Sequence, residues 1–125
     1  MIRKVILGFI VALMYANIAN AQTPPVASAN NKLQWGQPAQ DLSTASAYTY
    51  KWYLDGSATG TSFTGVTCTG TGPYQCIVMF PPVSQGNHII KISASNAAGE
   101  SPLSDPFSFT FVGKPLQPTN LQIVP

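Results

Sequence analysis

Two cysteines are the residues whose spacing most clearly predicts a covalent feature in this 125-residue chain. Cys68 and Cys76 bracket a segment that contains glycine and proline, so the chain can fold back on itself there. In an oxidising compartment, two cysteines this close together indicate a disulfide. The alternative is a metal site, but with His88 it would have at most three ligands, and the spacing is not that of a zinc site. We therefore expect a Cys68–Cys76 disulfide, no metal site and no cofactor.

His88 is the single histidine of the chain. A catalytic role would require an orienting carboxylate and a nucleophile within hydrogen-bonding distance. The sequence has no Gly-x-Ser-x-Gly motif, and its four acidic residues show no spacing typical of a catalytic pair. Asp41, Glu100 and Asp105 could meet at one end of the molecule, but calcium requires more oxygen ligands than they provide. We expect no catalytic residue and no enzymatic activity, and a structural role for His88.

The charged residues are few and largely balanced. Two of the six basic residues, Arg3 and Lys4, lie at the N-terminus, and the remaining four lysines balance the four acidic residues. A neutral body offers no basic surface for nucleic acid or for anionic lipid. Charged residues make up 8% of the chain, well below the usual proportion of about a quarter. Such a surface suits contact with sugars or self-association, because little charge must be desolvated.

Residues 1–21 have the three parts of a secretory signal peptide. Arg3 and Lys4 precede an apolar stretch at residues 5–15, and Ala19 and Ala21 supply the small side chains that a signal peptidase accepts. The apolar stretch is shorter than the roughly 20 residues that a membrane-spanning helix needs. We expect cleavage after Ala21, a secreted or periplasmic mature chain, and no stable membrane insertion.

Short runs of alternating apolar and polar residues predict antiparallel strands, each with one buried face. They occupy residues 32–35, 48–54, 88–96 and 107–111, and residues 76–80 form a further strand that is apolar on both faces. No apolar residues recur at helical spacing after the signal segment. We therefore expect an all-β fold, preceded by a cleavable signal helix, in which six or seven short strands form a two-sheet antiparallel sandwich. The predicted core consists of the inward-facing apolar side chains: Leu33, Trp35, Tyr50, Trp52, Leu54, Ile90, Ile92, Ala94, Phe107, Phe109 and Phe111.

Three segments resemble parts of a fibronectin type III domain of the secreted bacterial type, an immunoglobulin-like sandwich. Residues 33–35 (LQW) are similar to its second strand, residues 50–56 (YKWYLDG) to its third strand and following turn, and residues 83–104 to a longer run that ends in a Gly-Glu-Ser loop. The resemblance implies a domain over residues 32–112. His88 stands where the family usually has a tyrosine that ties a corner of the domain to upstream backbone. Here either an imidazole forms that tie or the tie is absent.

Two further segments flank this domain. Residues 22–31 form a first strand or a linker. Residues 113–125 are a proline-containing tail or an incomplete strand, in which the run PTNLQI resembles the opening strand of another copy of the module. Three alternatives remain open for this run. It is the remainder of a multidomain ancestor or of a truncated reading frame, it is a disordered tail, or it is an apolar strand that pairs with another strand. In the last case Leu121, Ile123 and Val124 would pair with a sheet edge of the same or another chain.

The resemblance implies an exported, non-catalytic binding, adhesion or spacer module that presents loops on a rigid sandwich. Its partner would be a protein or a polysaccharide. Two alternatives remain: a structural subunit of an extracellular filament or virion surface that adds a strand through the C-terminal tail, and a carbohydrate-binding accessory module detached from a secreted glycoside hydrolase. The candidate contact residues are two tyrosines and one loop: Tyr53, Tyr74, Asn96, Gly99, Glu100 and Ser101.

Overall fold

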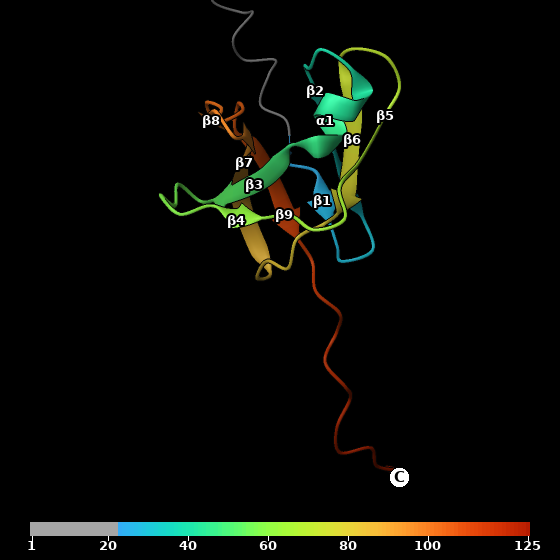
Figure 1. The fold of residues 1–125 in the computed structure, drawn as a ribbon. Coiled ribbons are helices and arrows are strands. Elements are labelled where there is room, and N and C mark those ends of the chain that lie inside the picture. The colour runs from blue at the N-terminus through green and yellow to red at the C-terminus, as the bar shows by residue number, and fades with distance from the viewer. Residues whose placement is uncertain (1–22) are drawn as a thin grey trace, which may run out of the picture.

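A computed structural model describes residues 23–125, which form a sandwich of two β-sheets (Figure 1). The all-β, two-sheet prediction is confirmed, and the arrangement is compatible with an immunoglobulin-like or fibronectin type III-like sandwich. The predicted signal peptide, residues 1–21, lies outside the described residues. Within residues 23–125 no helix is long and apolar enough to cross a membrane.

The larger sheet contains the strands that begin and end the sandwich. Its strand order is β1-β9-β7-β3-β4, and β8 pairs with the end of β7. Only the pairing of β1 with β9 is parallel, and β1 is two residues long, so it covers a small part of the edge of β9. The bounds are β1 (Val26–Ala27), β3 (Thr49–Leu54), β4 (Thr61–Ser62), β7 (Gly86–Asn96), β8 (Gly99–Glu100) and β9 (Phe107–Phe111).

The smaller sheet has three antiparallel strands in the order β2-β6-β5. They are β2 (Lys32–Gln37), β5 (Thr67–Thr69) and β6 (Tyr74–Met79). Cys68 and Cys76 lie opposite each other in the β5–β6 register and form a disulfide, as predicted. The opposite edge strand, β2, pairs with β6 and with no other strand of the described residues.

A short helix, α1 (Leu42–Ala47), occupies a segment that the sequence pattern assigned to a loop. The prediction of a fold without helix is wrong here, because six residues are too few to show a repeat of apolar side chains at helical spacing. The signal that was present is its N-cap. The Asp41 carboxylate accepts a hydrogen bond from the Thr44 backbone N–H at 2.8 Å, which satisfies one free donor of the first turn. Hydrogen bonding to the Thr44 side chain and backbone lowers the pKa of Asp41.

The core consists of two clusters of buried side chains. The first lies between the sheets and contains Ala27, Leu33, Val78, Phe80, Ile90, Phe109 and Phe111. The second lies beneath α1 and contains Ala45, Tyr50, Cys68, Cys76 and Ala94. The predicted core residues that are buried are Leu33, Tyr50, Ile90, Ala94, Phe109 and Phe111. Those that are partly buried and pack against the clusters are Trp35, Trp52, Leu54 and Ile92.

Phe107 is the predicted core residue that the structure places outside the core, with 45% of its surface exposed. Its ring stacks on Phe109, with ring centroids 6.4 Å apart. β1 pairs with Thr110 and Phe111, at the other end of β9, so no strand neighbour covers the β9 edge at Phe107. The alternation of β9 therefore predicted the correct face of the sheet but could not show that this end of the face is uncovered.

The segment after β9 contains no helix or strand and runs away from the sandwich (Figure 1). Its apolar side chains are among the most exposed of the described residues. The exposed fractions are 93% for Leu116, 84% for Leu121, 102% for Ile123 and 74% for Val124. These side chains thus make almost no contact with the domain that carries them.

Candidate functional site

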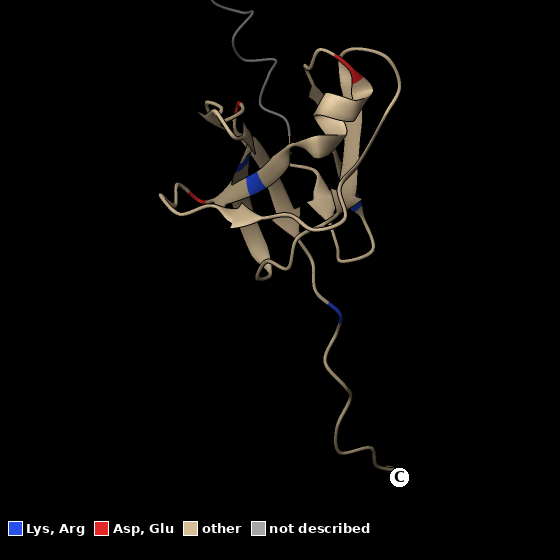
Figure 2. Cartoon of the chain, viewed as in Figure 1, with Lys and Arg blue, Asp and Glu red and all other residues tan. Residues whose placement is uncertain are grey.

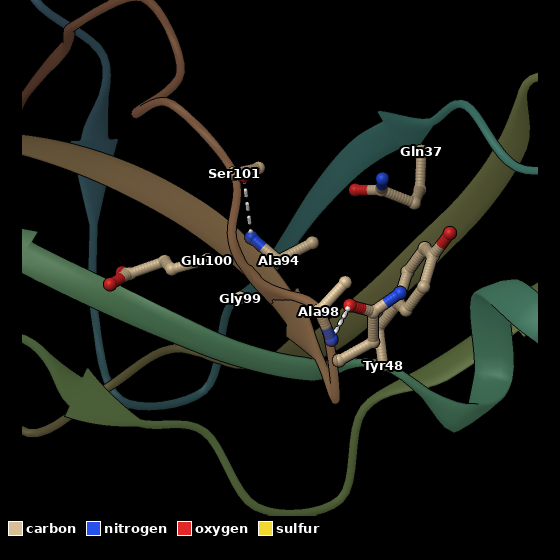
Figure 3. Close-up of a pocket in the computed structure, with 8 residues that line it drawn as sticks. Gln37, Tyr48, Ala94, Ala98, Gly99, Glu100 and Ser101 are labelled. Carbon is tan, nitrogen blue, oxygen red and sulfur yellow. Dashed lines mark hydrogen bonds between the residues drawn. The ribbon is translucent and has the colours of Figure 1, made fainter.

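The turn between β7 and β8 brings four of the six predicted contact residues to one pocket of about 320 Å³. Figure 3 shows this pocket, to which β2 contributes Gln37 and the end of α1 contributes Tyr48. The complete lining is Gln37, Tyr48, Ala94, Asn96, Ala98, Gly99, Glu100 and Ser101. Sequence reasoning missed Gln37 and Tyr48, because only the folded sandwich brings these distant segments beside the turn. We refer to this site as the turn pocket.

Several polar groups of the turn pocket are already used by the turn itself. The Asn96 side-chain oxygen accepts a hydrogen bond from the Ala98 backbone N–H at 2.9 Å, and the Ser101 hydroxyl accepts one from the Ala94 N–H at 3.0 Å (Figure 3). These bonds shape a tight connection between two strands. The Gln37 amide nitrogen donates to the Pro38 carbonyl at 3.0 Å, so the Gln37 amide oxygen and the ring of Tyr48 are the groups best placed to contact a ligand.

Glu100 lies at the edge of the turn pocket but its carboxylate points away from Tyr48 (Figure 3). It accepts hydrogen bonds from the hydroxyl groups of Tyr53 and Ser93. Ser93 and Tyr53 lower the pKa of Glu100, and the bond to Glu100 raises the pKa of Tyr53. The alternation of residues 88–96 predicted that Ser93 faces solvent, but its side chain is buried, with 2% of its surface exposed. Tyr53 and Glu100 thus join β3, β7 and β8 and are less available for binding than predicted.

Tyr74, the remaining predicted contact residue, lies apart from this turn. It begins β6, pairs in register with Gln37, and packs its half-buried ring against the cluster beneath α1. It lines neither of the two cavities described here. The structure therefore does not bring Tyr74 together with the other candidates.

His88 connects two corners of the larger sheet. Its Nδ1 lies 2.7 Å from the Asp55 carboxylate, and its Nε2 lies 2.7 Å from the Ser84 carbonyl oxygen and 3.3 Å from the Ser84 hydroxyl. A carboxylate and a carbonyl can only accept, so both ring nitrogens donate and the imidazole is held in its charged form. Accordingly, Asp55 raises the pKa of His88, and His88 lowers that of Asp55.

The order Ser84, His88 and Asp55 resembles a catalytic triad, but the hydrogen bonding differs in one respect. A general base needs a free lone pair on the nitrogen that faces the serine. Here the nitrogen on that side donates its proton to the Ser84 backbone carbonyl. His88 therefore ties the corner to upstream backbone, which answers the question left open by the missing tyrosine.

A second cavity, larger than the turn pocket, is a groove of about 550 Å³ between the free edge of β2 and the uncovered end of β9. We refer to it as the edge groove. Its apolar walls include Leu33, Trp35, Phe80, Ile92, Phe107 and Phe109, and its charged lining residues are Lys32 and Asp105. Sequence reasoning missed this site. The one available signal was Phe107, which the strand pattern assigned to the core.

The edge groove places the unpaired edge of β2 beside an apolar surface. Natural proteins usually protect free edges with proline, bulges, inward-pointing charges or a covering segment. The sequence of β2, KLQWGQ, contains no proline, and its one charge, Lys32, lies at the end of the strand. The edge is therefore available for another extended chain.

Charge contributes little to either cavity. Figure 2 shows the acidic and basic residues dispersed over separate elements of the sandwich. Within residues 23–125 no group of three or more His, Cys, Asp or Glu side chains could hold a metal ion, so Asp41, Glu100 and Asp105 do not form a site. Comparison of the chain with models of known protein families found no match, and a search of curated proteins also found none.

Proposed function

We propose that this chain is an exported, non-catalytic binding module, a sandwich of the fibronectin type III-like class, that binds an extended polypeptide along the free edge of β2. The observation that carries the proposal is the edge groove, in which the unpaired edge of β2 and an apolar cavity lie side by side. An incoming strand would gain backbone hydrogen bonds from β2, and its alternate side chains would enter the groove. Backbone bonds provide affinity in this mode, and the side-chain pockets provide specificity.

The composition of the edge groove supports an apolar ligand. Trp35, Phe107 and Phe109 supply aromatic surface, which dominates the energetics of many protein interfaces. Lys32 and Asp105 carry opposite charges, so the lining favours no net charge on the ligand. The partner that fits is an uncharged segment with apolar side chains at alternate positions.

Two observations support export. The Cys68–Cys76 disulfide is the kind of bond that persists in an oxidising compartment. Residues 1–21 have the pattern of a cleavable signal peptide. Expression of the full chain in a secreting host, followed by N-terminal sequencing, should give a mature chain that begins at Gln22. A chain retained in the cytosol with its first 21 residues would contradict this part of the proposal.

The binding proposal is tested with a library of uncharged extended peptides and a matched pair of variants. Phe107→Asp places a charge in the edge groove, whereas Met79→Asp places one at a similarly exposed apolar residue that does not line the groove. We expect Phe107→Asp to weaken peptide binding at least about tenfold, as expected for a buried charge without a partner, and Met79→Asp to bind like the parent. Equal losses in both variants, or no peptide bound by the parent, would contradict the proposal.

A second candidate function is carbohydrate binding at the turn pocket. Its specific support is that an aromatic ring, Tyr48, and a side-chain amide, Gln37, line the same pocket, in which Glu100 is the one charged residue among the described lining residues. Tyr48→Ala should then abolish retention on polysaccharide resins while Tyr74→Ala, which alters a tyrosine outside the pocket, leaves it unchanged. Retention that survives Tyr48→Ala would exclude this site.

A further inference from the structure

We infer that the polypeptide bound by the edge groove is the C-terminal segment of a second copy of this chain, residues 119–124, added as a strand along β2. The inference rests on the proposed function, because it names the partner of the same groove. It follows from three features of the described residues: the pattern of the tail, the length and facing of the groove, and the direction in which the tail leaves the domain.

The tail has the properties that the edge groove requires. Leu121 and Ile123 occupy alternate positions, so both side chains face one side of an extended chain. Pro118 and Pro125 lie outside residues 119–124, and every residue between them retains its backbone N–H for pairing. The segment carries no charge, and its apolar side chains lie in solvent instead of against their own domain.

The dimensions and the facing of the two segments agree. Both β2 and residues 119–124 are six residues long, and a fully extended segment of that length spans about 20 Å at roughly 3.3 Å per residue. Asn120 has a φ of 55° in the free tail, so it would become extended on pairing. Leu33 is buried and Trp35 half-buried on the inner face of β2. A strand hydrogen-bonded to that edge shares the same pleat, so Leu121 and Ile123 would continue this face. Their side chains would then cover the exposed part of Phe107.

The direction in which the tail leaves the sandwich favours binding to another copy over binding to its own groove. The N–H groups of Thr110 and Val112 bond to the carbonyls of Pro25 and Ala27, which fixes the chain as far as Val112 against β1. Beyond that residue the chain runs away from the sandwich (Figure 1). The donor segment and the acceptor groove are different surfaces of one molecule, and such head-to-tail contacts extend into chains of copies unless a rotation closes them.

Electrostatics does not oppose this assembly. Lys114 is the one charged residue in the tail, and it lies outside the donor segment. Lys32 and Asp105 offset each other at the groove. Association should therefore depend weakly on salt, in contrast to an interface built on unlike charges.

The test measures the mass of the full mature chain by light scattering across a range of concentrations. We expect the parent chain to grow in mass with concentration, and Leu121→Asp/Ile123→Asp and Phe107→Asp each to remain monomeric. Leu116→Asp is the matched control. It changes a residue of the same tail that is 93% exposed but lies outside the donor segment, so assembly should persist.

Mixing the two defective variants sharpens the test. Phe107→Asp keeps an intact tail, and Leu121→Asp/Ile123→Asp keeps an intact groove, so the mixture should form a species of two copies and nothing larger. A parent chain that stays monomeric at every concentration overturns the inference. So does protection from hydrogen exchange, independent of concentration, at the β2 amides that face away from β6, because it would show that the tail occupies its own groove.

A synthetic peptide of residues 114–125 separates failure of this inference from failure of the proposed function. Binding of this peptide by Met79→Asp but not by Phe107→Asp would support both. Binding of other uncharged peptides with the same dependence on Phe107, but not of residues 114–125, would overturn the inference and leave the proposed function standing. Loss of all dependence on Phe107 would overturn both.

Discussion

The two edges of the smaller sheet differ in how they are covered. At the β5 edge, the disulfide joins Cys68 to Cys76, α1 packs alongside, and Ala45 is fully buried. At the β2 edge, no strand, helix or covalent bond within residues 23–125 covers the backbone, and an apolar groove follows it. One edge of the same sheet carries a disulfide and a packed helix, and the other has neither within the described residues.

This difference supports the proposal that the β2 edge binds a partner. A free edge with an apolar surface beside it promotes unwanted pairing, and protein chains generally suppress it. At the β5 edge, this chain does cover a strand, because α1 packs beside it. The open β2 edge is thus better explained by binding than by a general lack of protection, and the following changes test that contrast.

The largest effect is expected from truncating the two stacked phenylalanines of β9 one at a time. Phe109 is 1% exposed and lies between the sheets, so Phe109→Ala should reduce the free energy of unfolding by about 3–5 kcal/mol. Phe107 is 45% exposed at the edge groove, and Phe107→Ala should cost about 1 kcal/mol or less. Urea unfolding of both variants measures the difference. Equal costs would mean that the groove is closed and the two edges are alike.

The strands of the larger sheet were predicted better from the sequence than the short helix and the buried polar residue were. Alternation in residues 88–96 and 107–111 predicted β7 and β9, because strands with one buried face show period two directly in their side chains. α1 was not predicted, because its six residues are too few to show a repeat of apolar side chains at helical spacing. The alternation also failed at Ser93, where burial follows from a hydrogen bond to Glu100 rather than from apolar character.

The candidate sites were harder to predict than the fold. The loop residues at 96–101 were identified because they lie close together in the sequence, and they do line one pocket. The edge groove depends on β2 lacking a second neighbour, and pairing partners are not encoded in the pattern of a single strand. Phe107 was therefore predicted to be a core residue. The register of β1, which pairs with Thr110 and Phe111, shows that no strand covers the edge of β9 at Phe107.

Removing the disulfide should weaken the closed edge selectively. The bond closes a loop of about nine residues, and Cys68→Ala with Cys76→Ala should lower the free energy of unfolding by about 2–3 kcal/mol. Hydrogen exchange should accelerate at the β5 amides and remain unchanged at the free edge of β2. Stability equal to that of the parent, or acceleration at both edges alike, would show that the disulfide does not distinguish them.

Tyr50→Phe should loosen the packing of α1 on the same edge. The buried Tyr50 hydroxyl donates to the Ala45 carbonyl at 2.7 Å, and its loss leaves that carbonyl unsatisfied at a cost of about 1–3 kcal/mol. Burial raises the pKa of Tyr50 to about 12, so a late tyrosine ionisation should vanish from the ultraviolet titration. Tyr48→Phe removes a neighbouring hydroxyl that does not make this bond and is the control. A loss of stability shared by both variants would contradict this role.

The smallest effect is expected at the corner formed by Asp55, Ser84 and His88, none of which belongs to β2 or β5, and it depends on pH. Asp55 raises the pKa of His88, so the stabilisation is complete below the unfolded value of 6.5 and is lost as pH rises through the higher folded value. The pKa of Asp55 is lowered, so its contribution is complete above 3.8 and is lost as pH falls through the lower folded value. Because the Asp55 side chain is 48% exposed, water screens the pair, and the change should not exceed about 1 kcal/mol.

Urea midpoints at pH 6 and pH 8.5 measure this contribution. His88 is the single histidine and both cysteines are oxidised, so no other side chain has an ordinary pKa inside that interval. The parent should be less stable at pH 8.5, and His88→Gln should show the lower stability at both values with little dependence on pH. Protection at the β2 and β5 edges, corrected for the base catalysis of amide exchange, should change little, because the hydrogen bonds of His88 go to Asp55 and Ser84 and not to either edge strand. If the stability of His88→Gln still falls between pH 6 and pH 8.5, a group other than His88 is responsible for the pH dependence.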